Sequence, residues 1–256
     1  MRFLLKLHIK KNVYGNILPI NYQYELSSMI YKVLSSANEE YATWLHNNGY
    51  RHDCGKSFKM FCFSRLHFEK CKLIKGSDRL AIFSDNACCQ VSFLPEIGTE
   101  KFIMGVFTNR EFDLGDRSSK VRFEVANIEA IPPPEFNDEM EYYSMSPIVI
   151  RQFQDGGYKK FLSPSDDKYT DAIESGLKSR YEAFYGKKID FMIRFEPLTE
   201  PKSSLVTIKA GTSNETKVRG FNYSFKIKAP IEIQKMIYEA GIGELCSQGF
   251  GCVRVK

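Results

Sequence analysis

The segment GIGELCSQGFG, residues 241–251, places four glycines within eleven positions near the end of the chain. Glycine allows positive φ angles and close approach of the backbone to a partner. Residues 230–240 before it predict a helix that begins at Pro230, and residues 249–256 predict the last strand. A dinucleotide-binding fingerprint must follow a strand and open a helix, so this order excludes it. Exposed N–H groups in such a turn can hold phosphate, whereas a helix end followed by a tight turn is the purely structural interpretation.

Upstream of this segment, the second half of the chain alternates between strand and helix patterns. Residues 165–185 predict a long amphipathic helix, because Tyr169, Ile173 and Leu177 fall on one stripe. Apolar or alternating stretches predict strands at residues 145–153, 191–196, 205–210 and 217–228. With the helix and strand around the glycine-rich segment, the second half therefore contains two helices among several strands.

The first half of the chain has the same order of elements. Residues 1–10 alternate and predict a strand that buries Phe3, Leu5, Leu7 and Ile9, with Arg2 on the opposite face. Helices are predicted near residues 26–34, at 38–48 and at 95–107, and strands at 57–66, 80–93 and 120–131. Strand, helix, strand, strand, helix, strand is the split βαβ plan. The sequence thus predicts an α+β fold of two tandem ferredoxin-like (βαββαβ) domains.

The boundary between the two domains is predicted at three consecutive prolines, residues 132–134, which an acidic run follows at 135–141. Proline interrupts regular structure, and a run of like charges is typical of solvated connections. We therefore expect an N-terminal domain at residues 1–131, a linker at 132–144 and a C-terminal domain at 145–256.

Composition excludes several classes of protein. The seven cysteines are odd in number and form no CxxC pair, which argues against a disulfide framework and a zinc site. No apolar run approaches the roughly 18 residues that a membrane helix needs. We expect a soluble cytoplasmic protein with no membrane partner, no metal and no cofactor. The net charge of +5 is too small to indicate nucleic acid by itself.

Two residues stand out on the first two strong helices. Because successive helical residues are about 100° apart, His46 points away from the stripe of Tyr41, Trp44 and Leu45. Tyr31 stands in the same relation to the stripe of its own helix. We therefore expect both side chains on exposed flanks of consecutive helices, where they could converge on one cleft.

The helix followed by GxGxxxxxGFG and a short final strand resembles the signature of the repeat-associated RNA-binding superfamily of CRISPR systems. Within it, the chain is similar to the Cas6 family of pre-CRISPR-RNA endoribonucleases. The resemblance spans both halves and rests on MRFLLKL (1–7), LPINYQYELSSMIYKVL (18–34), ATWLHNNGY (42–50) and SMSPIVI (144–150). The glycine-rich segment is common to the superfamily, which has non-catalytic members, whereas the helix pair points to the nucleases.

The resemblance implies a metal-independent cut, in which the 2′-hydroxyl attacks the scissile phosphate and leaves a 2′,3′-cyclic phosphate and a 5′-hydroxyl. This chemistry needs proton transfer and a cation for the phosphorane charge. The tyrosine and histidine of the family match Tyr31 and His46, with His52 as the reserve. Its lysine best matches Lys56, and Arg51 and Lys59 are the rivals.

The resemblance also implies binding of CRISPR repeat RNA. Candidate contacts are the cations of residues 217–228 and the glycines of the C-terminal segment: Lys217, Arg219, Lys226, Lys228, Gly241, Gly243, Gly249 and Gly251. An ordinary solvated strand face is the competing interpretation of the cations. Phe221, Tyr223 and Phe225 superficially fit a general RNA-recognition strand, but the RNP1 pattern is missing.

The main alternative function is a non-catalytic subunit that binds repeat RNA in a CRISPR effector complex. It predicts the same fold and RNA affinity, but it needs neither His46 nor Tyr31. Membership of an effector complex and formation of a homodimer are both left open, as is the repeat that is bound.

Overall fold

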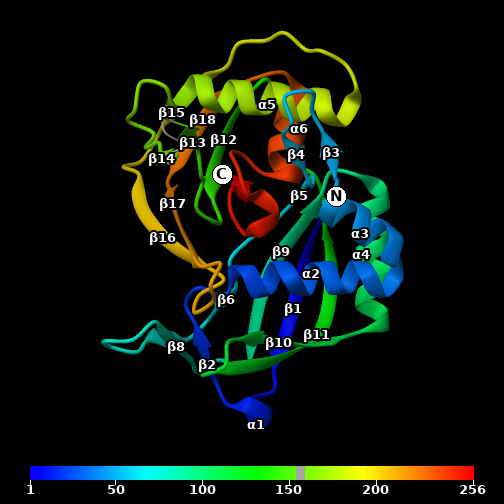
Figure 1. Cartoon of the computed structure of the whole chain (residues 1–256), viewed down its shortest axis with the longest axis vertical. Helices are drawn as coiled ribbons and strands as arrows, with labels where there is room; N and C mark the ends of the chain where they lie inside the picture. Colours follow the sequence, from blue (N-terminus) through cyan, green and yellow to red (C-terminus); the bar gives the residue numbers. More distant parts are fainter. Residues whose placement is uncertain (154–158) are drawn as a thin grey trace.

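A computed structural model describes residues 1–153 and 159–256 of the chain. Antiparallel sheets and a few helices make up the fold (Figure 1). The helices are α1 (Lys11–Tyr14), α2 (Gln23–Ala37), α3 (Glu39–Asn47), α4 (Glu96–Thr108), α5 (Tyr169–Tyr185), α6 (Ile231–Ala240) and the short 3-10 helix η1 (Cys246–Gln248).

The main sheet of the first half has the strand order β10-β11-β1-β9-β5, with β6 also paired to β9. Its strands are β1 (Arg2–Ile9), β5 (Phe61–Phe63), β6 (His67–Phe68), β9 (Asn86–Phe93), β10 (Glu111–Gly115) and β11 (Lys120–Ile131). The prediction for β1 is confirmed, because its four alternate apolar residues are buried. Arg2 was expected on the face opposite the buried one, but only 2% of this residue is exposed, since it contacts the second half of the molecule.

Helices α2 and α4 cover the apolar face of this sheet (Figure 1). Leu26, Ile30 and Leu34 of α2 are fully buried in the same core as the inward residues of β1. Burying one such side chain stabilises a fold by about 1.5–3 kcal/mol. Gly105 of α4 lies against the carbonyl of Val33, so the two helices approach too closely there for any side chain. Phe107, near the end of α4, is 64% exposed.

The main sheet of the second half has the order β15-β18-β12-β19. Its strands are β12 (Glu139–Ser144), β15 (Arg194–Pro197), β18 (Ser224–Lys228) and β19 (Val253–Val255). Helices α5 and α6 pack on it, with Ile173 and Ile237 in one core with Phe225.

Two expected strands of this half were placed wrongly. The first strand of the sheet is β12 rather than residues 145–153, so part of the expected linker belongs to the sheet. Residues 217–228 form two strands in different sheets, because the chain leaves one hairpin and enters the main sheet near Tyr223. Alternation alone does not reveal such a change of partner.

Smaller antiparallel groups of strands surround the two main sheets. They are β2 (Ile17–Pro19) with β8 (Arg79–Ile82) and β7 (Cys71–Leu73), β3 (Tyr50–Arg51) with β4 (Ser57–Phe58), β13 (Arg151–Phe153) with β14 (Lys159–Phe161), and β16 (Lys202–Ile208) with β17 (Thr216–Asn222).

The end of the chain packs against the first half. The Arg2 guanidinium donates to the carbonyl of Val253 at 2.6 Å and to that of Tyr238, whose ring it also covers. Ser27 of α2 donates to the carbonyl of Ser247 in η1 at 2.7 Å. A side chain at Gly249 would meet Gln23 of α2 at 2.9 Å. Glycine at this position thus lets η1 lie directly on α2.

Candidate active site

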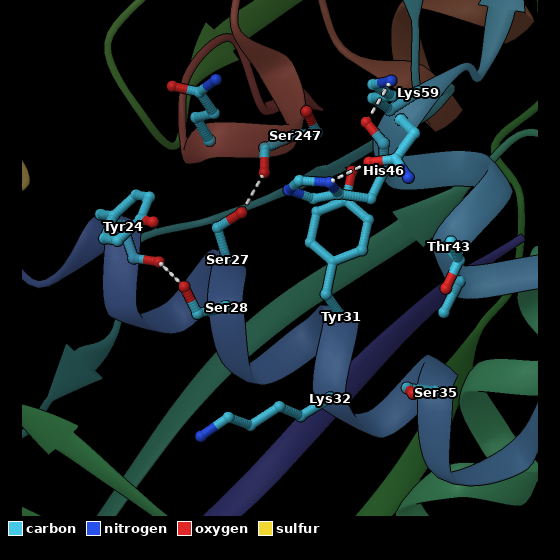
Figure 2. A pocket seen from close by; sticks show the side chains of 13 residues that line it. Tyr24, Ser27, Ser28, Tyr31, Lys32, Ser35, Thr43, His46, Lys59 and Ser247 are labelled. Atoms are coloured by element: carbon cyan, nitrogen blue, oxygen red, sulfur yellow. Dashed lines mark hydrogen bonds between the residues drawn. The ribbon is translucent and has the colours of Figure 1, made fainter. Parts of the chain in front are cut away.

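Tyr31 of α2 and His46 of α3 lie side by side, as predicted. Their rings meet edge to face, with centroids 5.1 Å apart and an interplanar angle of 82°, and Figure 2 shows the imidazole of His46 above the ring of Tyr31. Asn38 caps α3 by accepting from the backbone N–H of Tyr41 at 2.7 Å, which fixes where that helix starts. The predicted convergence of Tyr31 and His46 is therefore confirmed, whereas their catalytic roles stay predictions.

A cavity of about 550 Å³ opens beside these two rings. One wall is α2, the second is α3 with Lys59, and the third is η1 (Figure 2). The polar side chains that line it are Tyr24, Ser27, Ser28, Tyr31, Lys32, Ser35, Thr43, His46, Asn47, Lys59, Ser247 and Gln248. Polar side chains from distant parts of the sequence therefore come together in one cavity.

Tyr31 was expected on an exposed flank, but it is held largely within the protein, with its ring against Phe61 at a centroid distance of 5.6 Å. Burial raises the pKa of Tyr31 well above its usual range, and a hydrogen bond with Ser247 acts in the opposite direction. The phenol therefore keeps its proton near neutral pH. It can donate a hydrogen bond to a substrate oxygen, but it is not a base there.

The imidazole of His46 is oriented by its neighbour in the chain. Its Nδ1 lies 3.0 Å from Oδ1 of Asn47. Because an amide oxygen only accepts, this contact places the proton of a neutral imidazole on Nδ1 and leaves the Nε2 lone pair free. Trp44 of the same helix is 38% exposed and packs edge to face on the ring of Tyr50.

Of the candidates for the lysine of the family, Lys59 and not Lys56 lines the cavity, which Lys32 of α2 also lines. Its Nζ donates to the carbonyl of His46 at 2.8 Å and to Ser57 Oγ at 3.3 Å. Burial lowers the pKa of Lys59, and the positive charge of Arg51 lowers it further. Lys56 lies outside the cavity, exposed in the turn between β3 and β4.

Gly49 explains how Lys59 reaches this position. Its φ of 60° is in the left-handed region, and a Cβ there would stand 2.6 Å from the carbonyl of Phe58 and 2.9 Å from Cδ of Lys59. The hairpin of β3 and β4 then carries the residues of its turn, Lys56 among them, away from the cavity. Spacing along the sequence could not predict this, because it does not show where the hairpin turns back.

The two remaining candidates from this hairpin also point elsewhere. His52 Nε2 lies 3.0 Å from Glu182 of α5, and Arg51 donates to Asn48 Oδ1 at 2.5 Å. His52 lines a different, smaller cavity on α5.

The positive φ angles of the glycines in residues 241–251 serve contacts within the protein. The N–H of Gly251 donates to the carbonyl of Pro147 at 2.9 Å, and that of Gly249 donates to Cys246 at 3.3 Å. Side chains at Gly243 and Gly251 would clash with the carbonyls of Val149 and Ile242. The segment faces the cavity through Ser247 and Gln248, which sequence reasoning missed. RNA contact by Gly241, Gly243, Gly249 and Gly251 stays a prediction.

The predicted basic residues divide between two sheets. Lys226 on β18 lies between Glu139 at 3.7 Å and Glu196 at 3.8 Å, and Lys228 pairs with Asp138 at 3.0 Å. Lys217 and Arg219 are exposed on β17, and in the described part of the chain neither forms an ion pair. Residues 217–228 contain no acid. The lysines of β18 are nevertheless paired, with Glu139 of β12, Glu196 of β15 and Asp138 just before β12.

The described residues hold no group of three or more His, Cys, Asp or Glu side chains arranged for a metal ion. None of the helices in the described ranges combines the length and the apolar character needed to span a membrane.

Known protein families match both halves of the chain. Residues 17–129 match the model described as CRISPR-associated protein Cas6, N-terminal, and residues 131–255 match that described as CRISPR associated protein Cas6, C-terminal.

Individual relatives cover nearly the whole chain. It is 30% identical to CRISPR-associated endoribonuclease Cas6 1 of Methanocaldococcus jannaschii. The 241 aligned residues cover 93% of this chain and 87% of the relative. It is 27% identical over 257 aligned residues to CRISPR-associated endoribonuclease Cas6 of Pyrococcus furiosus. This alignment covers 100% of this chain and 90% of the relative. A solved structure described as an RAMP protein binding different RNA substrates matches with a TM-score of 0.83 and 26% identity, over 100% of this chain and 99% of that one. The chain therefore belongs to the Cas6 family of CRISPR-associated proteins.

Proposed function

We propose that this chain cuts CRISPR repeat RNA to produce guide RNAs, with the chemistry in the cavity between α2, α3 and η1. The relatives from M. jannaschii and P. furiosus are named endoribonucleases, and the similar RAMP protein is described as binding RNA substrates. One observation carries the proposal for this chain, namely that Tyr31, His46 and Lys59 line the same cavity. Together they offer a proton donor, a proton acceptor and a cation.

The proposed reaction uses side chains and no metal ion. The 2′-hydroxyl attacks the adjacent phosphorus, the bond to the 5′-oxygen breaks, and the products carry a 2′,3′-cyclic phosphate and a 5′-hydroxyl. His46 takes the proton of the 2′-hydroxyl through Nε2, which the contact of Nδ1 with Asn47 leaves unprotonated. Tyr31 donates a hydrogen bond to a phosphate oxygen, because its buried phenol keeps its proton.

Lys59 supplies the positive charge that the phosphorane needs. An ammonium group in a partly enclosed cavity stabilises developing negative charge more strongly than the same group in water. Its lowered pKa also makes it a better proton donor to the leaving 5′-oxygen. We therefore assign to Lys59 the role for which Lys56 and Arg51 were the other candidates.

The RNA strand is proposed to reach the cavity along the β16–β17 hairpin. Lys217 and Arg219 are exposed there without carboxylate partners among the described residues. Lys209 of the same hairpin lies 5.4 Å from the ring centroid of Tyr24, which lines the cavity. Lys226 and Lys228 are weaker candidates for phosphate contact, because each would first have to leave its acidic partner.

We also infer that the two halves are tandem ferredoxin-like domains, at residues 1–131 and 139–256. The second one starts before the expected residue 145, because β12 is the first strand of its sheet. The strand order supports this. If four strands of each sheet are numbered 1 to 4 in chain order, their order across the sheet is 4-1-3-2 in both halves. These strands are β1, β5, β9 and β11 in the first half, and β12, β15, β18 and β19 in the second. In each half, helices follow the first and third of these strands.

The test is incubation with a cognate repeat RNA in the presence of EDTA, with the ends of the products identified by mass spectrometry. The proposal expects one cut that leaves a 2′,3′-cyclic phosphate and a 5′-hydroxyl. Tight binding without any cut would instead support the repeat-binding subunit of an effector complex. Cleavage only after addition of a divalent metal would refute the mechanism. Sedimentation of the same sample tests the homodimer.

A further inference from the structure

Cys54, His52 and Glu182 form a chain of contacts outside the cavity already described. The Sγ of Cys54 lies 2.8 Å from His52 Nδ1, and His52 Nε2 lies 3.0 Å from Glu182 Oε2. Cys54 and His52 belong to the turn between β3 and β4, whereas Glu182 is on α5, 130 residues away from His52 in sequence. Cys54 is exposed, and His52 and Glu182 are partly buried.

The roles of the two ring nitrogens follow from these partners. The backbone N–H of Cys54 donates to His52 Nδ1 at 3.1 Å, so Nδ1 carries a lone pair. The proton of the neutral ring is then on Nε2, where it is donated to the carboxylate of Glu182. The Nδ1 lone pair thus faces both the backbone N–H and the thiol of Cys54. A base that faces a thiol and is itself oriented by a carboxylate is the arrangement that activates nucleophiles.

The electrostatics agree with this geometry. The backbone N–H of Lys56 and the imidazole of His52 lower the pKa of the Cys54 thiol. Hydrogen bonds with Glu182 and Cys54 raise the pKa of His52. Both shifts favour a thiolate beside an imidazolium.

The other cysteines have different surroundings. Burial raises the pKa of Cys89 to about 12 and also raises that of Cys246. Cys71 is exposed like Cys54, but among the described residues it has no contact with a His or carboxylate such as the contact of Cys54 with His52. Cys71 is therefore an internal reference for an exposed thiol without a histidine contact among the described residues.

We propose that Cys54 is a modification site, where a thiol activated by His52 and Glu182 exchanges with small-molecule disulfides. His52 takes the thiol proton, and the thiolate attacks one sulfur of the disulfide. A new bond forms between Sγ and that sulfur, and the original S–S bond breaks. The leaving thiolate receives the proton from His52, so the protein thiol is oxidised and one half of the reagent is reduced.

The position of Cys54 gives the modification a consequence. The same turn joins α3, which carries His46, to Lys59, and the contact of His52 with Glu182 ties it to α5. A mixed disulfide adds bulk at this contact, so the turn is expected to separate from α5. Any effect on RNA cleavage rests on the proposed function, whereas the exchange does not.

The experiment treats the full-length protein with 2-hydroxyethyl disulfide at pH 7 and follows each cysteine by peptide mass spectrometry. Cys54 is expected to react at least about tenfold faster than Cys71, because exchange near neutral pH follows the thiolate fraction. Because the pKa of Cys54 is lowered, its rate should also reach its plateau at a lower pH than that of an ordinary thiol. Equal rates for the two cysteines would overturn the proposal.

The variant Glu182→Gln tests the relay. It should slow Cys54 several-fold and leave Cys71 unchanged. Asp171→Asn is the matched control, because Asp171 lies on the same helix and lines the same small cavity but does not contact His52. An unchanged rate at Cys54 in Glu182→Gln would contradict the role of the carboxylate. Neither readout uses RNA, so failure here leaves the proposed function standing.

Discussion

The cavity beside α2 and α3 encloses its cationic and polar groups, whereas the exposed face of β17 presents its cations to solvent. Around the cavity, Tyr31 and Lys59 are partly enclosed, and each has its pKa moved by burial. Along β17, Lys217 and Arg219 stand in solvent. Enclosed charges act strongly over short distances, whereas exposed charges act weakly and are screened by salt. The cavity should therefore control the rate of cleavage, and β17 should control affinity.

The strand β18 marks the limit of this comparison. It carries the same residue types as β17, yet Lys226 and Lys228 lie against acids from neighbouring parts of the sheet. Residue type alone thus does not make a phosphate-binding strand, since the partners across the sheet decide whether a cation is available.

Replacing His46 should have the largest effect. His46→Ala removes the proposed base, so the single-turnover cleavage rate should fall about 10²- to 10⁴-fold, with RNA affinity within about twofold of the wild type. His67→Ala is the control, because His67 is exposed on β6, outside the cavity. Near-normal cleavage by His46→Ala would move the assignment to another base, with His52 the first to test.

The two lysines of the β3–β4 region give a sharper comparison. Lys59→Ala should lower the cleavage rate about 10²- to 10³-fold, as removal of one group that stabilises developing charge does. Lys56→Ala, three residues earlier and exposed, should stay within about twofold. A larger loss in Lys56→Ala than in Lys59→Ala would show that the hairpin rearranges when RNA binds.

The salt dependence of binding separates β17 from β18. The log–log slope for a single strand changes by about 0.7 for each phosphate contact, so removing Lys217 and Arg219 together should reduce it by about 1.4. Removing Lys226 and Lys228 together should leave the slope unchanged. Fluorescence anisotropy with a labelled, uncleavable repeat RNA measures both. The reverse result would refute the proposed path of the strand.

Two glycines test how Lys59 is positioned, with the smallest expected effect. Gly49 and Gly55 both have positive φ, but only Gly49 has neighbours within reach of a Cβ. Gly55→Ala should lower the free energy of unfolding by about 1–2 kcal/mol, the cost of a left-handed residue. Gly49→Ala adds a contact with Phe58 and Lys59 and should cost more in chemical denaturation, with slower cleavage. Equal losses of stability in the two variants would mean that Gly49 is needed only for its left-handed backbone and not to position Lys59.

Much of the cavity could be predicted, because its helical residues follow a local rule. The 3.6-residue period places Tyr31 and His46 on the flanks of their helices, and Asn38 marks where the second helix begins. The same rule fails for Lys59, since the turn of a hairpin depends on contacts between residues that are distant along the chain. It also fails for Ser247, which reaches α2 across 220 residues of sequence through its contact with Ser27.

The strands show the same limit. Alternation predicted β1 and β11 well, because each lies in one sheet along its whole length. It did not separate β17 from β18, since both alternate and only their partners differ. The acids that neutralise β18 include Glu139 of β12, in a segment whose composition suggested a linker.

The most direct test of one shared active site is a double-mutant cycle on single-turnover cleavage, with Tyr31→Phe, His46→Ala and the combined variant at saturating RNA. Groups that act as a unit are strongly non-additive. If Tyr31 and His46 belong to one site, the combined variant should be no slower than His46→Ala alone. Rate losses that multiply would contradict one shared site, because Tyr31 and His46 would then act independently.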